Sequence, residues 1–189
     1  SIIGNSYGAM VGGQFAAASP AKVDRFVAIG GIGYSLTSPF PPEGINRLVD
    51  FVEEPSRERM RAWLEAMVYN RALVTPELIE ARYAAAIDPK IMESSRKMYT
   101  RQSIAAIAEA MRGPHAAERL AYLAKIEAPT LITWGRDDRV TPVDGAFVPM
   151  RMVRNAELHI FPNCGHWSMI ECKDRFEGLV LDFLGVRAG

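Results

Sequence analysis

The serine best placed to do covalent chemistry has a glycine two positions away on each side. Ser6 stands in the run Gly4-Asn5-Ser6-Tyr7-Gly8, which matches G-x-S-x-G, the pattern of a sharp strand-to-helix turn that exposes a nucleophile. A Cβ at either glycine is expected to collide with the neighbouring helix and strand. The N–H of Tyr7 would face a developing oxyanion at a helix N-terminus, whose field favours negative charge. The pattern therefore predicts Ser6 as nucleophile and Tyr7 as oxyanion donor, against an ordinary Gly/Ser loop.

An acid that could assist this serine lies just past a later apolar run. Asp138 belongs to Gly135-Arg136-Asp137-Asp138-Arg139, which follows the apolar run TLITW. A carboxylate at that place can accept the Nδ1–H of a histidine, fix its tautomer and stabilise the imidazolium. Asp137 is the adjacent rival, and the G-x-x-D spacing from Gly135 favours Asp138. A charged surface loop or a helix cap is the plainer alternative.

One of the three histidines lies where a general base is needed. His166 is in the run FPNCGHW, which again follows an apolar segment. His159 lies inside ELHIF, which predicts a strand residue with a structural role, and His115 lies in a loop. The order Ser6, Asp138, His166 is the chain order of α/β-hydrolases and differs from the two common serine-protease orders. The three loops together favour a Ser-Asp-His triad over an incidental loop histidine.

The elements that must position these residues alternate between strands and helices. Short apolar runs predict strands, and the longer segments between them, such as the Gly- and Ala-rich residues 7–18, predict helices. The strands are expected over 1–3, 23–29, 130–135 and 157–161, helices over 7–18 and 167–184, and a helix or loop over 143–153. Strands that alternate with helices favour a parallel sheet covered on both faces, an α/β fold.

The long stretch between the second and third expected strands has a different texture. From about residue 37 to residue 113 it has helical periodicity, many charges and no convincing strand. Thr75 and Asp88 each precede a proline, which is typical of a capping side chain before the first helical position. We therefore expect a core over 1–36, a helical insertion over 37–113 and the rest of the core over 114–189.

The composition is that of an ordinary globular protein. The chain has 189 residues, is 49% hydrophobic and carries a formal net charge of zero. Zero charge gives no electrostatic reason to expect nucleic acid or an anionic membrane, and no apolar run approaches the ~20 residues of a transmembrane helix. Cys164 and Cys172 make no metal-ligand pattern and fit a reducing compartment. We expect a cytoplasmic protein without a metal or cofactor.

Four segments together resemble a known enzyme family. GNSYG, the insertion after the following strand, TWGRDDRVTP and FPNCGHW are similar to the meta-cleavage product hydrolases, which cut a carbon–carbon bond in ring-fission products of aromatic degradation. The likeness runs along nearly the whole chain, and GRDDR and CGHW are its most specific parts. It implies an α/β-hydrolase fold, here the C-terminal portion of a mostly parallel sheet with helices on both faces and a helical cap.

The resemblance also implies roles for single residues. Besides the triad, it matches Asn5 to a polar pocket residue beside the serine and Trp167 to an aromatic wall beside the histidine. It matches Arg82 to the cap arginine that pairs with the substrate carboxylate. An exposed helix arginine, solvated or paired with an acid elsewhere, is the alternative for Arg82. A small molecule is the expected partner, and the oligomeric state, a homo-oligomer included, stays open.

The chemistry of carbon–carbon hydrolysis fits these residue types. The leaving carbon must hold negative charge, which a 2-hydroxy-6-oxo-2,4-dienoate provides once its dienol has become a ketone. A guanidinium can hold the carboxylate with two parallel hydrogen bonds, and an oriented histidine can move protons to and from the substrate. The sequence therefore predicts a hydrolase of such dienoates, with an acyl-enzyme and an activated water both open.

Other interpretations stay open beside this one. A serine esterase or lactonase would use the same triad, and a non-catalytic fragment or binding module belongs to a different class. A haloalkane dehalogenase is disfavoured, because those enzymes use Asp where this chain has Ser6. The second oxyanion N–H of the fold comes from a loop after an early strand. We expect that strand upstream of residue 1, and we expect the segment by itself to be poorly stable and inactive.

Overall fold

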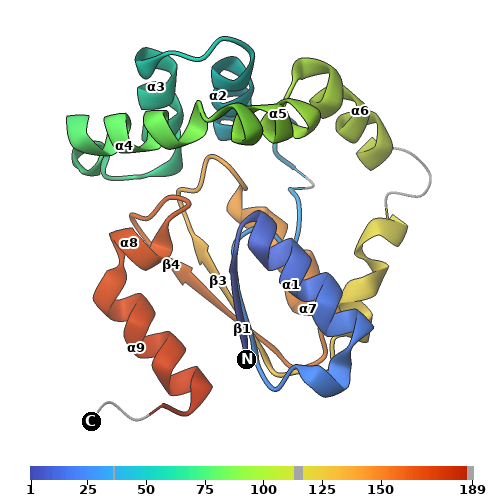
Figure 1. Ribbon diagram of the computed structural model, residues 1–189. Coiled ribbons are helices and arrows are strands. Elements are labelled where there is room, and N and C mark those ends of the chain that lie inside the picture. Colours follow the sequence, from blue (N-terminus) through green and yellow to red (C-terminus); the bar gives the residue numbers. More distant parts are fainter. Residues whose placement is uncertain (36, 113–116, 187–189) are drawn as a thin grey trace.

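Four parallel strands form the sheet at the centre of the molecule. The structure is a computed structural model that describes residues 1–35, 37–112 and 117–186. The strands lie in chain order, and every neighbouring pair is parallel (Figure 1). Their bounds are β1 Ile2–Asn5, β2 Phe26–Ile29, β3 Thr130–Gly135 and β4 Ala156–Phe161. Because all four run the same way, the loops that follow them meet at one edge of the sheet.

Helices and short 3₁₀ helices connect these strands. Those of the sheet region are α1 Tyr7–Ala18, η1 Pro20–Lys22, η3 Ala117–Lys125, η4 Val143–Ala146, α7 Phe147–Met152, α8 Ser168–Glu171 and α9 Lys173–Leu184. Those between β2 and η3 are α2 Glu43–Glu53, α3 Arg57–Met67, η2 Arg71–Leu73, α4 Pro76–Ala86, α5 Pro89–Met98 and α6 Arg101–Arg112.

The central strands are buried on both faces. In β2, Phe26 and Ala28 join an apolar cluster that includes residues of α1. Val27 and Ile29 point the other way, into a cluster that includes residues of α9. This is the period-two alternation of a strand. Because both faces are covered by helices, the whole of β2 and of β3 is buried, as is typical of a parallel sheet.

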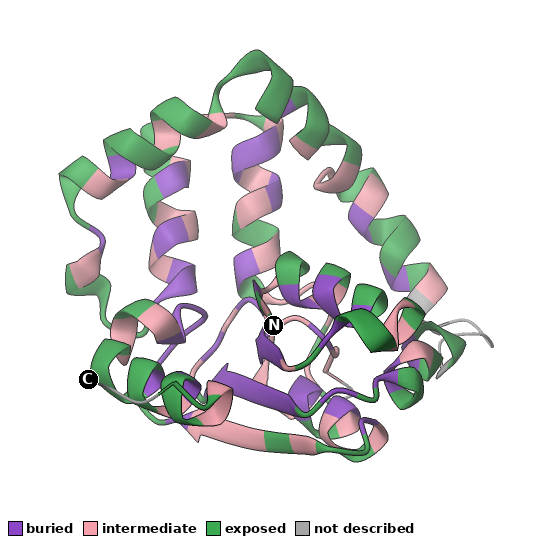
Figure 2. Cartoon of the chain, turned by 60° about the horizontal axis from the view of Figure 1, so that its bottom comes forward, coloured by how far each residue is buried: buried purple, intermediate pink, exposed green. Residues whose placement is uncertain are grey.

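Helices α2 to α6 lie across the carboxyl ends of the strands (Figure 1). Helices α2 to α5 share an apolar cluster, in which Phe51, Met60 and Leu64 are fully buried. Val140 and Trp167, from the loops after β3 and β4, belong to the same cluster. Figure 2 shows buried and exposed residues alternating along these helices. The helical layer is therefore packed onto the loops at the carboxyl edge of the sheet.

Most expected elements lie where the sequence predicted them. The helix over 7–18 and the strand over 130–135 have the expected bounds. Thr75 and Asp88 accept hydrogen bonds from main-chain N–H groups in the first turns of α4 and α5. The described residues of the 37–113 segment contain helices and no strand.

Two expected elements are wrong in detail. The strand expected over 23–29 begins only at Phe26, because the 3₁₀ turn η1 still extends to Val23, whose N–H donates to the carbonyl of Pro20. The single helix expected over 167–184 is two helices. Cys172, with φ −121° and ψ 34°, leaves the helical conformation between α8 and α9.

The expected boundaries of the helical insertion fall on or beside residues outside the described part of the chain. These are residue 36 and residues 113–116, which include His115. The division into 1–36, 37–113 and 114–189 stays a prediction. Within the described ranges, no helix combines the length and the apolar character that crossing a membrane requires.

Candidate active site

Ser6 occupies the sharp turn between β1 and α1. Its φ of 54° and ψ of −118° lie outside the regions that most residues adopt, which costs about 1–3 kcal/mol. The Ser6 N–H donates to the Ile29 carbonyl of β2 at 2.8 Å, and the Ser6 carbonyl accepts the N–H of Ala9 at 3.0 Å. The strand, strained turn and helix that G-x-S-x-G requires are therefore present.

The two glycines of this motif differ in their surroundings. A Cβ at Gly4 would overlap the main-chain carbonyl of Gly8, so the missing side chain lets α1 pass close to β1. A Cβ at Gly8 would meet nothing within 4 Å in the described part of the chain. The expectation that a side chain would collide at both glycines is therefore wrong for Gly8.

Asp138 and His166 form a buried hydrogen-bonded pair. Oδ2 of Asp138 lies 2.7 Å from Nδ1 of His166, and each side chain is 1% exposed. The same oxygen accepts the Thr141 hydroxyl at 2.8 Å. Oδ1 accepts the N–H groups of Val140 at 2.7 Å and Thr141 at 2.9 Å. These contacts satisfy a carboxylate that burial would otherwise penalise, and they turn Nδ1 toward the acid, which leaves Nε2 facing away from it.

Ser6 and His166 border the same two-residue turn after β2. A Cβ at Gly31 would overlap the Ser6 backbone, and one at Gly30 would lie 3.5 Å from Cε1 of His166. The hydrogen bonds of the His166 ring run from Nδ1 to the acid loop rather than to Ser6. The structure thus brings the three residues to one edge of the sheet, with Asp138 and His166 in direct contact and the serine beside them. Catalytic hydrogen bonds commonly tighten only when substrate is bound.

Asp137, the rival acid, points elsewhere. Its carboxylate lies 3.2 Å from the Arg136 guanidinium, and it accepts the N–H of Cys164 at 3.4 Å. Asp138 is the carboxylate that reaches His166, as the G-x-x-D spacing predicted.

Asn5 and Tyr7 flank Ser6 in different surroundings. The Asn5 side-chain amide donates to the Ile29 carbonyl at 3.2 Å, the same acceptor that takes the Ser6 N–H. Asn5 therefore helps to hold the turn. Tyr7 is the first residue of α1, so its N–H is one of the initial helix donors that have no partner within the helix. That position is the one an oxyanion donor requires.

Arg82 and Trp167 come together between the helical layer and the sheet. The guanidinium carbon of Arg82, on α4, lies 5.4 Å from the centroid of the Trp167 ring, within the range of a cation–π contact. Trp167 is buried and directly follows His166, whereas Arg82 is exposed. In the described part of the chain Arg82 takes part in no ion pair. Its positive charge is therefore available beside the histidine loop.

Tyr99, the residue after α5, is partly buried against the apolar cluster of the helical layer, and no sequence pattern pointed to it. Burial raises the pKa of the Tyr99 phenol, and the Tyr7 phenol adds a smaller contribution in the same direction. Tyr99 therefore stays neutral at neutral pH.

Thr141 and Glu171 are two further polar residues that sequence reasoning missed. Thr141 contacts both Asp138 and His166, and its place three residues after the acid is the one signal that could have pointed to it. Glu171 accepts the N–H of nearby Gly165 and that of Tyr69, which is far away in the sequence, and no local pattern could reveal the second contact.

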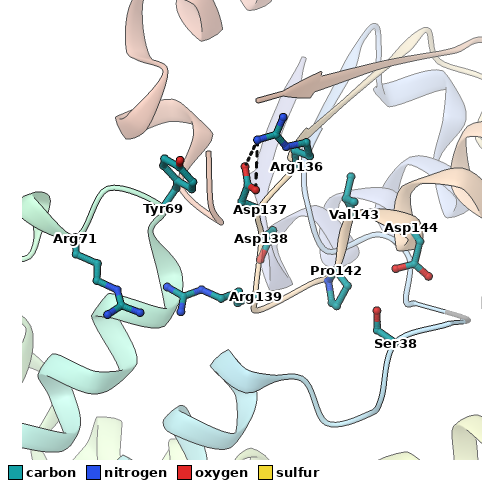
Figure 3. Close-up of a pocket in the computed structure, with 10 residues that line it drawn as sticks. All are labelled: Ser38, Tyr69, Arg71, Arg136, Asp137, Asp138, Arg139, Pro142, Val143 and Asp144. Atoms are coloured by element: carbon teal, nitrogen blue, oxygen red, sulfur yellow. Dashed lines mark hydrogen bonds and ion pairs between the residues drawn. The ribbon is translucent and has the colours of Figure 1, made fainter. Parts of the chain in front are cut away.

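Two pockets lie near these residues. Figure 3 shows one of about 460 Å³ beside the acid loop, which Asp138 and the Arg136–Asp137 ion pair line and which neither Ser6 nor His166 lines. The other, of about 450 Å³, is mostly apolar, lies between α1 and α6, and reaches Gly31, which contacts the Ser6 backbone. Of these two pockets, the second reaches the Gly31 turn beside the serine, although Ser6 is not among its lining residues.

Comparison with known families agrees with this arrangement. Residues 1–179 match the model of a family described as "Alpha/beta hydrolase family". The chain belongs to the alpha/beta hydrolase family. The parallel sheet with helices on both faces, expected from the sequence, is the fold of this family and is confirmed.

This alpha/beta hydrolase is similar to meta-cleavage product hydrolases, as the sequence motifs indicated. It is 35% identical over 187 residues to the 2-hydroxy-6-oxo-6-phenylhexa-2,4-dienoate hydrolase of Burkholderia cepacia, covering 97% of this chain and 62% of that protein. It is 37% identical over 186 residues to 2-hydroxy-6-oxononadienedioate/2-hydroxy-6-oxononatrienedioate hydrolase 2 of Pseudomonas putida, again covering 97% and 62%. The chain thus spans about 62% of the length of these relatives.

The fold is also similar to that of a solved structure. The meta-cleavage product hydrolase of Pseudomonas fluorescens IP01 superposes with a TM-score of 0.81 at 33% identity. The match covers 97% of this chain and 64% of that one.

Proposed function

We propose that the protein is a serine-dependent hydrolase of a carbon–carbon bond in 2-hydroxy-6-oxo-dienoates. The observation that carries this proposal is the buried Asp138–His166 pair, 2.7 Å apart, beside the strained turn of Ser6. Such an arrangement activates a hydroxyl and moves protons. The dienoate-hydrolase names of two relatives support the substrate class.

In the proposed mechanism Ser6 and His166 act on the ketone form of the substrate. His166 takes the proton of the Ser6 hydroxyl, or of a water that Ser6 polarises, as a new C–O bond forms at the ketone carbon. The carbonyl electron pair moves to oxygen, where the N–H of Tyr7 donates a hydrogen bond. When the pair returns, the C–C bond breaks and His166 gives its proton to the leaving carbon. If Ser6 is the attacking group, a water then attacks the resulting ester, the ester C–O bond breaks, and the water proton passes through His166 to the Ser6 oxygen as the acid is released. Asp138 stabilises the imidazolium throughout.

Three further residues would hold the substrate. Arg82 would bind its carboxylate through two parallel hydrogen bonds, Trp167 would form an aromatic wall, and Asn5 would line the pocket beside the serine. The contact of Arg82 with the Trp167 ring supports this arrangement, because it keeps the guanidinium next to the histidine loop.

The proposal also covers the division of the chain and its location. Residues 37–113 would form a cap over a core of 1–36 and 114–189, which the separate apolar cluster of α2 to α5 supports. Cys164 and Cys172 are free thiols, and burial raises the pKa of the Cys164 thiol, so it stays protonated. Free thiols support a reducing compartment such as the cytoplasm.

A side-by-side assay of a dienoate and a p-nitrophenyl ester tests this function in the whole protein. We expect the dienoate to be the better substrate. Ser6→Ala and His166→Ala should each lower turnover by at least about a thousandfold. The matched pair Asp138→Asn and Asp137→Asn should separate the acids, because only Asp138 contacts His166.

The outcomes separate the alternatives. Turnover of esters alone would identify a serine esterase or lactonase instead. Near-normal turnover by the His166→Ala variant would disprove the triad.

A further inference from the structure

Glu171 binds three main-chain N–H groups that belong to two distant segments. Its Oε1 accepts the N–H of Gly165 at 2.7 Å. Its Oε2 accepts the N–H of Tyr69 at 2.7 Å and that of Asn70 at 3.0 Å. Hydrogen bonds to a carboxylate are roughly twice as strong as those between neutral groups. Glu171 ends α8, just before the break at Cys172 that separates α8 from α9.

These bonds join the histidine loop to the end of α3. The first segment, residues 162–167, is the histidine loop, and the second, residues 68–70, is the cap linker between α3 and η2. The histidine loop also contacts α3 directly, because the N–H of His166 donates to the carbonyl of Met67, the last residue of α3, at 2.7 Å.

Gly165 shows how closely the two segments lie. A Cβ at Gly165 would be 2.7 Å from the Met67 carbonyl oxygen and 2.9 Å from the Tyr69 nitrogen. The main chain on the N-terminal side of His166 is therefore pressed against the cap linker, with the Glu171 carboxylate bonded to both.

The geometry points to Glu171 as a positioning residue for His166. It holds the histidine loop against the cap linker, so the position of the His166 main chain relative to the helical layer depends in part on this carboxylate. Among the described residues its hydrogen bonds are with main-chain N–H groups, so it acts through His166 and not on the reacting atoms. The inference rests on the proposed function only in taking His166 as the residue that moves protons.

The test compares Glu171 variants of the whole protein with a control on the neighbouring helix. Glu171→Ala removes all three acceptor contacts, Glu171→Gln keeps one oxygen, and Glu171→Asp keeps both on a shorter side chain. Glu177→Ala is the control, because Glu177 is a half-exposed carboxylate of α9 that pairs with Lys173 at 2.8 Å. Rates are expressed per reactive serine, titrated to completion with a fluorophosphonate, so that loss of folded protein does not count as loss of catalysis.

We expect the Glu171→Ala variant to lower kcat by about 10- to 100-fold, because small displacements of a catalytic group have effects of this size. KM should stay within about twofold, the Gln and Asp variants should recover part of kcat, and Glu177→Ala should match the wild type. Wild-type kcat per titrated serine in all Glu171 variants would overturn the inference. So would a rise in KM with kcat unchanged. If the Ala variant does not fold, the Gln and Asp variants decide by the same measures.

Failure of the proposed function can be told apart from failure of this inference. If the wild type hydrolyses esters but no dienoate, the function is wrong and the ester rates of the variants judge Glu171. If neither substrate reacts, the rate at which the fluorophosphonate labels Ser6 judges Glu171, because that rate also depends on His166. Equal labelling rates in wild type and variants would then overturn the inference.

Discussion

A buried carboxylate is stable only when its oxygens are satisfied, and both oxygens of Asp138 are. Oδ1 accepts two main-chain N–H groups, and Oδ2 accepts the Thr141 hydroxyl and faces the His166 ring. An unpaired buried acceptor would cost about 1–3 kcal/mol, and more if charged. The Thr141 hydroxyl also lies 3.3 Å from Nδ1 of His166, so one side chain contacts both members of the pair. The acid loop therefore fixes the orientation of the histidine ring.

The Arg82 guanidinium, which has no ion-pair partner among the described residues, leads to a prediction about substrate charge. Arg82→Ala should raise KM for a dienoate by about 10- to 100-fold, because hydrogen bonds to a charged group contribute about 1.5–3 kcal/mol. It should leave KM for a neutral p-nitrophenyl ester nearly unchanged. Steady-state kinetics with both substrates measure the difference.

Arg96→Ala is the matched control for Arg82, since Arg96 is another exposed arginine of the helical layer, on α5. It should affect neither substrate. Equal losses on the two substrates in the Arg82 variant would remove the carboxylate role.

The sequence could predict the candidate triad residue by residue, but not the groups that support it. Ser6, Asp138 and His166 each follow a strand, and loops after parallel strands meet at one edge, so their proximity is readable from strand order. No local pattern marks Glu171 or Tyr99. Glu171 binds a main-chain N–H that is far away in the sequence, and Tyr99 belongs to the helical layer.

At the scale of the element, the turn from β1 into α1 depends on one close approach. Gly4→Ala should destabilise the chain by about 1–3 kcal/mol, because its Cβ would overlap the Gly8 carbonyl and force the backbone apart. Gly8→Ala is the matched control and should stabilise by about 0.5–1 kcal/mol, because its Cβ meets open space and glycine weakens a helix. Urea unfolding of the 189-residue chain measures both changes, and equal effects from the two would contradict the explanation.

Elements were predicted best where pattern and cap agreed. Thr75 and Asp88, each followed by proline, marked helix starts that the structure has. The break at Cys172 was missed because residues 168–184 carry no glycine or proline at that point. The break comes directly after Glu171, whose hydrogen bonds to the histidine loop and the cap linker are tertiary contacts that a local sequence pattern does not show.

At the scale of the whole molecule, the helical layer and the loops that carry Asp138 and His166 share one packed unit. Val140 and Trp167 lie in the apolar cluster of the helices. Arg139, between Asp138 and Val140, donates to the carbonyls of Glu65 and Val68 at the end of α3. A shift of α3 would therefore move both loops, which explains why residues far apart in sequence reach the Asp138–His166 pair together.

The outer side of α1 carries an apolar stripe. Tyr7, Val11 and Phe15 are four residues apart, so they line one side of the helix, and each is 44–52% exposed. Ile3 of β1, which is 53% exposed, lies on the edge strand of the described sheet, where its side chain points to the face opposite α1 because Ile2 packs against that helix. Contiguous exposed apolar patches and open strand edges both promote association.

We therefore expect the 189-residue chain on its own to self-associate through this stripe. The double variant Val11→Lys, Phe15→Lys should shift it toward monomer, because two like charges on the stripe oppose contact between copies. Ile91→Lys is the control: Ile91 on α5 is 49% exposed, as is Val11, but lies away from the stripe. Light scattering over a range of concentrations measures the change. An equal shift in the control, or none in the double variant, would show that the stripe does not drive association.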